Sequence, residues 1–425
     1  MAQSLPELPP DILAEIFSRL PIKTLFACRS VCKTFLNLTF SNPPVNFLRS
    51  SDTAQNLIIQ FGDFHKPAAS IHLVDSELDT SFVSGERVFL KPMFQIPKYP
   101  VMYFKKCRLH AGDENKFVLV NSCNGLLYFA ERGVCERSFV CNPITDEYVT
   151  LLGINEQNNE RQLMMGSWFG FSPAENQYKV LRLFSTLIGK PWQIGFRQEF
   201  WAQVHVIGSD SWRYLEDKPL SEYLSWDTCS VFLNGTVNWL CKYPELSKFI
   251  IFFDFQKEKF GEILPPPSFG IDQRLSKQSM SIGVLGGYLC VTDDTQHFDI
   301  WVMKEYGCQK SWTKEFTIDT TIPTGEPLRG PFRPLYMLRD GKILMIWLER
   351  ALVCYDPKNK RFRFFEFFEV ESLAKAVPYT PSFLCLKDAL MVDNVMVQNM
   401  SSRYELAFGT NLSFKFMLFF RSSFD

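Results

Sequence analysis

Apolar positions follow two different periods along this chain. Between residues 12 and 20, apolar side chains recur every three or four residues, which places them on one face of a helix. Pro21 ends this run, and Thr24 is placed to cap a second helix. A third short turn holds Phe35. The first 45 residues therefore predict an all-α module of three short helices.

Three helices of this size cannot bury a core of their own. Chains below ~40 residues usually need a metal, disulfides or a partner to fold stably. The cysteines show no zinc-ligand spacing and no compact disulfide framework. We therefore expect a partner, or the rest of the chain, to cover the apolar faces of the helices.

From about residue 55 the helical period gives way to short β-type runs separated by tight turns. Four of the turns end in glycine: Asn124-Gly125, Asn234-Gly235, Gly286-Gly287 and Asp340-Gly341. Such pairs supply the positive φ angles that two-residue hairpin loops require. The pattern therefore predicts a series of antiparallel hairpins.

A second kind of turn follows each of the first kind. In three places Asn or Asp opens a polar turn and an aromatic follows six residues later: Asn142 and Tyr148, Asp254 and Phe260, Asp356 and Phe362. Ser211-Trp212 and Ser311-Trp312 look like variants. The aromatics at 212, 260, 312 and 362 are 48, 52 and 50 residues apart. A period near 50 with two hairpins per unit predicts four-stranded propeller blades.

Five such units fit the chain, and strands remain at both ends. The units cover about residues 116–152, 167–216, 228–264, 280–318 and 334–367. Strands at about 57–74 and 382–386 are expected to combine into a sixth blade, because a closed ring leaves no exposed sheet edges. The expected domains are the helical module at 1–45, a linker at 46–56 and an all-β propeller of six four-stranded blades at 57–425.

The helical module resembles an F-box. It reads Leu8-Pro9-x-Asp11-Ile12-Leu13-x-Glu15-Ile16-Phe17, continues through Leu20-Pro21 to Leu25, and ends in Val31-Cys32-Lys33-x-Phe35, with Phe35 where the family usually has Trp. The resemblance implies docking on the Skp-type adaptor of a cullin-based ubiquitin ligase. The implied contacts are Leu8, Pro9, Ile12, Leu13, Ile16, Leu20, Pro21, Leu25, Val31 and Phe35. The alternative is an amphipathic hairpin packed on its own domain.

The repeat region also resembles a known domain. Asn121-Ser122-Cys123-Asn124-Gly125, Phe169-Gly170-Phe171-Ser172-Pro173 and Asn234-Gly235-x-x-Asn238-Trp239 are similar to motifs of the F-box-associated, kelch-like domain of plant F-box proteins. The resemblance implies a substrate receptor: the F-box holds the adaptor and through it a cullin, and the propeller holds a client protein for ubiquitination. The alternative is a propeller that binds proteins without a ligase.

The connections of the predicted propeller differ between its two faces. Short turns lie on one face, whereas the links between blades and an insertion at 185–199 lie on the other. Long loops on a rigid scaffold often carry binding residues, and aromatic and Arg side chains are enriched in binding hot spots. The predicted client contacts are Trp192, Trp226, Phe269 and Arg333.

Composition narrows the remaining classes. Lys and Arg total 45 against 46 for Asp and Glu, which removes the charge footprint of a nucleic-acid binder or of a protein held to anionic lipid. The start lacks a signal-peptide pattern, the longest apolar runs are far too short to span a membrane, and the twelve cysteines are scattered. We expect a protein of the cytoplasm, the nucleus or both, with no catalytic residues, no metal and no cofactor.

Overall fold

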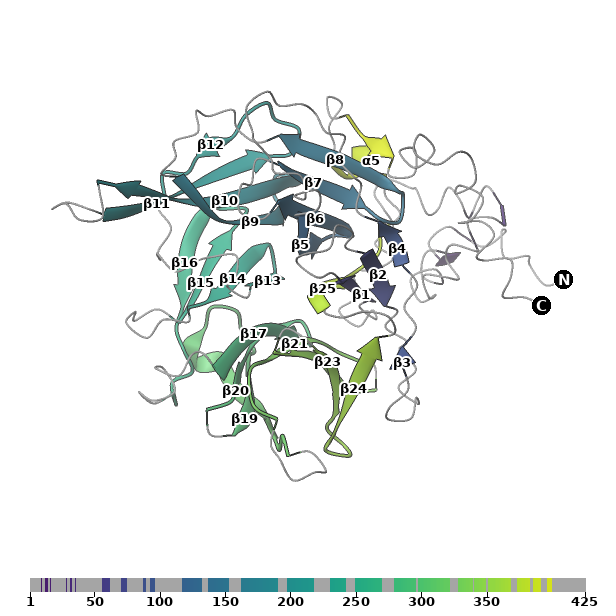
Figure 1. Cartoon of the computed structure of the whole chain (residues 1–425), viewed down its shortest axis with the longest axis vertical. Helices are drawn as coiled ribbons and strands as arrows, with labels where there is room; N and C mark the ends of the chain where they lie inside the picture. Colours follow the sequence, from purple (N-terminus) through teal and green to yellow (C-terminus); the bar gives the residue numbers. More distant parts are fainter. Residues whose placement is uncertain are drawn as a thin grey trace, which may run out of the picture.

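The computed structural model describes most of the propeller and a few residues before it. The described residues are 9, 12, 13, 16, 28, 31, 32, 35, 56–61, 70–74, 87–88, 92–95, 117–131, 137–152, 162–189, 197–217, 230–241, 249–269, 279–295, 297–321, 328–338, 340–348, 351–367, 373–382, 385–390 and 396–399. Six sheets stand around a common centre (Figure 1). The predicted six-bladed propeller is confirmed.

Five blades are built from four consecutive antiparallel strands, innermost first. Blade 1 comprises β5 (Phe117–Cys123), β6 (Leu126–Glu131), β7 (Arg137–Asn142) and β8 (Glu147–Leu152). Blade 2 comprises β9 (Gln162–Ser172), β10 (Gln177–Ile188), β11 (Arg197–Val206) and β12 (Arg213–Tyr214). Blade 3 comprises β13 (Ser230–Leu233), β14 (Thr236–Leu240), β15 (Ile250–Asp254) and β16 (Lys259–Ile263).

The next two blades follow the same plan. Blade 4 comprises β17 (Met280–Leu285), β18 (Tyr288–Asp293), β19 (Phe298–Met303) and β20 (Trp312–Ile318), with the short helix η3 (Gln309–Ser311) before its last strand. Blade 5 comprises β21 (Phe332–Met337), β22 (Ile343–Trp347), β23 (Ala351–Asp356) and β24 (Arg361–Phe367). All five blades lie where the repeat predicts them.

The sixth blade joins the two ends of the described chain. Its innermost strand is β25 (Leu373–Tyr379), followed outward by β1 (Asn56–Phe61), β2 (Ser70–Val74) and β4 (Pro92–Gln95). The expected C-terminal strand at 382–386 is wrong, because the helix α5 (Leu386–Leu390) begins there. The sequence obscures β25 because it contains Pro378. That proline is tolerated since β25 pairs on one side only, with β1.

Two short strands extend the outer edges of blades. β26 (Gln398–Asn399) pairs antiparallel with β8, and β3 (Arg87–Val88) pairs parallel with β24. Both come from segments far along the chain from the blade that they extend. The outer edge of a blade in this fold therefore accepts an additional strand.

The predicted turn chemistry is present in the hairpins. Both central residues have positive φ in three of the first turns, with angles of 49° and 82° at Asn124-Gly125. In the second turns, the Asp254 carboxylate accepts the backbone N–H groups of Gln256 and Lys257 at 2.9 and 3.0 Å. Asp356 does the same for Lys358 and Asn359. The residue four positions after each opening Asn or Asp takes positive φ, at Asp146, Glu258 and Lys360. These side-chain bonds explain the repeated spacing.

Strand direction fixes two distinct faces of the ring. The turns within the strand pairs β5–β6 and β7–β8, and their counterparts in the other blades, lie together on what we call the tight-turn face. The connections between blades and between β10 and β11 lie on the opposite face, the long-loop face. The link between blades 5 and 6 is shorter than expected, because β25 begins at Leu373.

A polar side chain bridges each of the six interfaces between neighbouring blades. The bridges run from Gln60 to Phe117 and Leu119, from Asn121 to Phe169, from Trp168 to Ser230, from Tyr306 to Asn238, from Thr292 to Phe332, and from Arg333 to Ala376. Apolar packing fills the rest of each interface, as where the rings of Trp168 and Trp239 meet edge to face with centroids 4.8 Å apart. The ring is therefore held by apolar packing and by directional hydrogen bonds at every interface.

Candidate protein-binding surfaces

The described residues of the helical module separate into buried and exposed positions. Leu13 and Phe35 are 1% and 6% exposed, whereas Ile12 and Val31 are 49% and 67% exposed. The backbone N–H groups of Ile12 and Leu13 both donate to the carbonyl oxygen of Pro9, so the first helical turn begins there. Leu13 and Phe35 therefore pack within the chain, whereas Ile12 and Val31 leave apolar surface exposed. Leu8, Leu20, Pro21 and Leu25 lie outside the described residues.

Phe269, a predicted client contact, is a core residue. Its ring is 3% exposed and packs edge to face against Phe249 and Trp301. The link that carries it is held to blade 4 by two side chains: Trp312 donates to the carbonyl oxygen of Leu264, and Gln309 to that of Pro265. The prediction of Phe269 as a surface anchor is wrong, because aromatic packing draws this link into the ring.

Arg333, another predicted contact, is also buried. It lies in the innermost strand of blade 5, and its guanidinium donates to the carbonyl oxygen of Ala376 in β25 at 3.4 Å. Only 5% of the residue is exposed. Arg333 therefore joins blade 5 to blade 6 and is not a client anchor. The remaining predicted contacts, Trp192 and Trp226, lie outside the described residues.

Blade 2 extends further than the other blades on the long-loop face. Its strands β9, β10 and β11 contain 11, 12 and 10 residues, whereas the four strands of each other blade contain four to seven. Figure 1 shows the β10–β11 pair reaching beyond the ring, beside the label β11. Both ends of the expected insertion at 185–199 are thus paired strand, since β10 runs to Ile188 and β11 starts at Arg197.

Aromatic rings form a row across the extended blade. The ring of Trp201 stacks on that of Phe184 with centroids 4.1 Å apart, and Tyr214 lies on its other side at 5.2 Å. The indole N–H of Trp201 donates to the Thr186 hydroxyl at 2.9 Å. Tyr214, at the outer end, is 55% exposed. The row offers the kind of rigid apolar surface that is enriched in protein interfaces.

A second group of side chains in blade 2 surrounds the Trp212 ring. The guanidinium of Arg182 lies 3.8 Å from the centre of the Trp212 ring, and His205 stacks on the same indole. Arg182 also donates to the hydroxyl of Ser138 in blade 1. Burial, together with the charge of Arg182, lowers the pKa of His205 and so favours its neutral form. These contacts fix blade 2 against blade 1.

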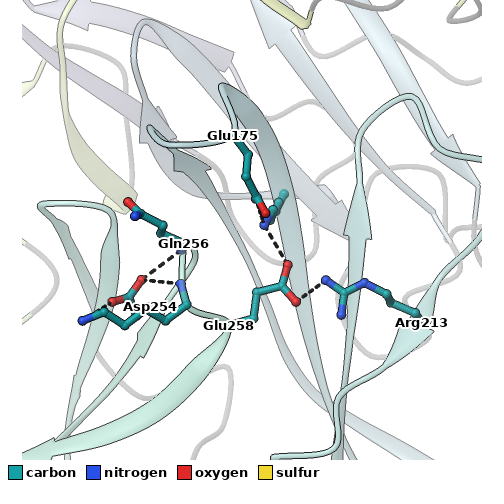
Figure 2. Close-up of polar contacts among 7 residues, drawn as sticks. Glu175, Arg213, Asp254, Gln256 and Glu258 are labelled. Carbon is teal, nitrogen blue, oxygen red and sulfur yellow. Dashed lines mark hydrogen bonds and ion pairs between the residues drawn. The ribbon is translucent and has the colours of Figure 1, made fainter.

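An ionic network joins blades 2 and 3 on the tight-turn face (Figure 2). The buried ammonium of Lys179 lies 2.7 Å from one carboxylate oxygen of Glu258 and also bonds Glu175. The other oxygen of Glu258 bonds Arg213. The hydrogen bond from Lys179 lowers the pKa of Glu175. Every charge in this network has a partner of opposite sign, so the network is suited to linking two blades rather than to capturing a ligand.

Four buried cysteines are suited to packing rather than to covalent chemistry. Burial raises the pKa of Cys354 to about 12 and also raises those of Cys123, Cys141 and Cys290. Their thiols are therefore protonated at neutral pH and are poor nucleophiles. Within the described ranges, no three His, Cys, Asp or Glu side chains are grouped as metal ligands. In the same part of the chain, no helix has the length and apolar character needed to cross a bilayer.

The fold and the apolar helical module define a class: a closed propeller preceded by an F-box. Residues 5–45 match the F-box domain, and residues 93–384 match the F-box associated beta propeller domain. The chain belongs to the family of F-box proteins with an F-box-associated propeller. The expected linker at 46–56 lies outside the described residues except for Asn56, which begins β1.

Curated relatives align with more than four fifths of the chain. F-box protein At3g07870 of Arabidopsis thaliana is 26% identical over 394 residues, covering 84% of this chain and 87% of the relative. F-box protein CPR1 of the same plant is 26% identical, covering 83% of both chains. Among solved structures, a puromycin-hydrolyzing peptidase of Mycobacterium tuberculosis aligns over 76% of this chain and 48% of its own with 13% identity and a TM-score of 0.36, which is too weak to carry an argument.

Proposed function

We propose that this protein is the substrate-recognition subunit of a Skp/cullin/F-box ubiquitin ligase. The observation that carries the proposal is the presence, in one chain, of an F-box match and a closed propeller of the F-box-associated family. The F-box binds the adaptor and through it the cullin, while the propeller binds the client. Ubiquitination follows from proximity, and the chain itself acts without covalent chemistry, in the cytoplasm or the nucleus.

The adaptor contact is apolar. Ile12 and Val31 supply the exposed surface, and a buried Leu13 and Phe35 hold the helices that present them. The other members of the contact set are Leu8, Pro9, Ile16, Leu20, Pro21 and Leu25. A large exposed aliphatic side chain gains about 1.5–3 kcal/mol when it is buried fully, so two such positions make a substantial share of an interface.

The client contact lies on the long-loop face. Trp192 and Trp226 remain candidate contacts there. The extended part of blade 2 adds the aromatic row of Phe184, Trp201 and Tyr214. A rigid ring carrying this surface presents a bound client in a fixed orientation to the charged ubiquitin carrier.

The test is co-purification of the full chain with a Skp-type adaptor and a cullin. The variant Ile12→Asp with Val31→Asp places charges at the apolar contact and should abolish capture of the adaptor, while Lys257→Asp, on the tight-turn face, should leave it unchanged. Undiminished capture by the double variant would exclude the proposed contact. Adaptor binding without any cullin would instead favour a ligase-independent scaffold.

A further inference from the structure

The third strand of blade 2 lacks a full outer neighbour. β12 pairs with only Gln203 and Val204 of the ten-residue β11. In blades 1, 3, 4 and 5 the outermost consecutive strand pairs along most or all of the third strand. No described strand therefore lies beside the outer edge of β11 between Arg197 and Trp201.

The described residues that follow β12, 215–217, turn away from this edge. Leu215 makes the last backbone bond to β11, donating to the carbonyl oxygen of Ala202 at 2.9 Å. Two residues later, the carboxylate of Asp217 accepts the backbone N–H of Phe260 in blade 3 at 2.8 Å. At Asp217, the last described residue before β13, the chain thus bonds blade 3 and not β11.

Two residues of β11, Gln198 and Phe200, point their backbone N–H and C=O groups to the open edge. The bond to Leu215 shows that the carbonyl of Ala202 points outward. In an antiparallel ladder, every second residue points both its N–H and its C=O to the same side. The pairing of β10 with β11 is regular throughout, so Phe200 and Gln198 also point outward, while Glu199 and Trp201 point toward β10.

Two other blades show that such an edge accepts a strand. β26 adds to β8 in blade 1, and β3 adds to β24 in blade 5, each through a two-residue ladder. At blade 1 a side-chain bond between Tyr148 and Gln398 reinforces the pair. The open part of β11 is longer than either added strand.

The surroundings of the edge define what it would bind. Gln198 and Glu199 are exposed, and Phe200 and Trp201 are half-buried. A strand added beside β11 would lie next to the aromatic row of Phe184, Trp201 and Tyr214, which reaches the edge at the exposed Tyr214. Because side chains alternate between the two faces of a sheet, the added strand would bring every second side chain to these rings.

We propose that the outer edge of β11, at Gln198 and Phe200, binds an extended segment of the client protein as an added β-strand. The segment carries an aromatic or aliphatic side chain at alternate positions, and its backbone bonds the N–H and C=O groups of these two residues. This inference rests on the proposed function, since the segment belongs to the client.

The first test measures whether the edge is open. In the full chain bound to a Skp-type adaptor, hydrogen exchange resolved by residue should be fast at the amides of Gln198 and Phe200 and slow at those of Glu199 and Trp201. Slow exchange at all four amides in this sample, with no client or peptide added, would mean that another segment of this chain, or a second copy, occupies the edge. That result would overturn the proposal.

The second test supplies the strand. A phage-displayed library of random peptides of about 12 residues is selected on the full chain. The selected peptides should show alternating apolar positions and should slow exchange at Gln198 and Phe200. N-methylation of a peptide at alternate residues should abolish binding in one register and spare it in the other. A selection that yields no peptide protecting these two amides overturns the proposal.

A matched pair of variants locates the contact. Gln198→Pro removes an N–H that points away from β10. The fold should tolerate this change, because edge positions of a sheet accept proline. It should weaken peptide binding by about tenfold or more, while Gln198→Ala, which keeps the N–H, should change it by less than about twofold. Equal binding to both variants would overturn the assignment. The N-methyl peptides provide the same information if the proline variant does not fold.

Adaptor capture separates the two proposals. Gln198→Pro should bind the adaptor as well as the unchanged protein does. If the unchanged protein captured no adaptor but the peptides still protected Gln198 and Phe200, the proposed ligase role would fail while the strand site stood. If adaptor capture were normal and the peptides protected neither residue, only the strand site would fail.

Discussion

The side-chain oxygen of Gln60 accepts the backbone N–H of Leu119 at 2.7 Å. The nitrogen of the same amide donates to the carbonyl oxygen of Phe117 at 2.9 Å. One side chain thus makes with the backbone of β5 the two kinds of hydrogen bond, donated and accepted, that a neighbouring strand would make. Gln60 is 3% exposed and lies where blade 6 meets blade 1. This amide therefore links β1 of blade 6 to β5 of blade 1 by two hydrogen bonds.

Replacing Gln60 by Met should destabilise the propeller. The substitution keeps the length of the side chain but leaves the Phe117 carbonyl and the Leu119 N–H buried without their partner. We expect a loss of about 2–4 kcal/mol in the free energy of unfolding, measured by urea denaturation. Gln256→Met, in an exposed turn, should cost less than about 0.5 kcal/mol. Equal stability of the two variants would show that the Gln60 bonds are dispensable.

Two turn glycines form a matched pair. Gly125 and Gly287 have nearly the same φ, 82° and 80°, but a Cβ on Gly125 would overlap Ser382, whereas nothing lies within 4 Å of one on Gly287. Both Ala substitutions incur the same backbone strain, so the additional loss in Gly125→Ala measures packing of the segment after β25. We expect this difference to exceed about 1 kcal/mol. Thermal unfolding of the two variants, with proteolysis after residue 380 as a second readout, would test it.

The ionic network of blades 2 and 3 should depend on Glu258. Glu258→Gln leaves the buried ammonium of Lys179 with Glu175 alone, and we expect a loss of about 2–3 kcal/mol in stability. Arg213→Gln removes an exposed partner of the same carboxylate and should cost less than about 1 kcal/mol. Combining Glu258→Gln with Lys179→Met should recover part of the loss, because the uncompensated charge is then removed. Additive losses in that combination would contradict a direct interaction.

Acid should weaken the same network through Glu175. Its pKa is lowered in the folded protein, first by the hydrogen bond from Lys179, so the carboxylate stabilises the fold above its unfolded pKa. This contribution is lost as the pH falls through the lowered, folded pKa. The difference in unfolding free energy between the unchanged protein and Glu175→Gln should therefore be constant near neutrality and shrink below about pH 4.5. Urea denaturation at a series of pH values checks this, and a difference that grew with acid would contradict it.

Local sequence patterns were sufficient for the blades but not for their closure. The Asn-Gly turns and the polar turn opened by Asp254 depend on backbone and side-chain groups within a few residues, so their spacing predicts the hairpins. The strand β25 depends on long-range pairing with β1, and its Ala, Lys and Pro residues carry little β propensity. The apolar run after it resembles a strand, yet it leads into α5, whose Leu386 packs on blade 1.

The candidate binding surface likewise has features that local sequence predicts and features that depend on distant contacts. Side-chain type marked Phe269 and Arg333 as anchors, but burial is decided by contacts with Phe249 and Ala376, which lie in other blades or distant segments. The extension of blade 2 had a signal in the sequence, because apolar residues and strand formers continue past Leu183 and resume before Trp201. The open edge of β11 had none, since it follows from where β12 ends.

The late position of β25 in the sequence determines when the ring can close during synthesis. Ribosomes deliver the F-box first, then the three outer strands of blade 6, and only after five complete blades the strand that lies inside them. Until Tyr379 emerges, β1 has a bare inner edge and the ring stands open. Under the proposed ligase role, a nascent or prematurely terminated chain would thus present its F-box to an adaptor before its propeller is closed. Under the same proposal, ring closure separates a ligase subunit that can bind its client from one that would occupy the cullin without a client.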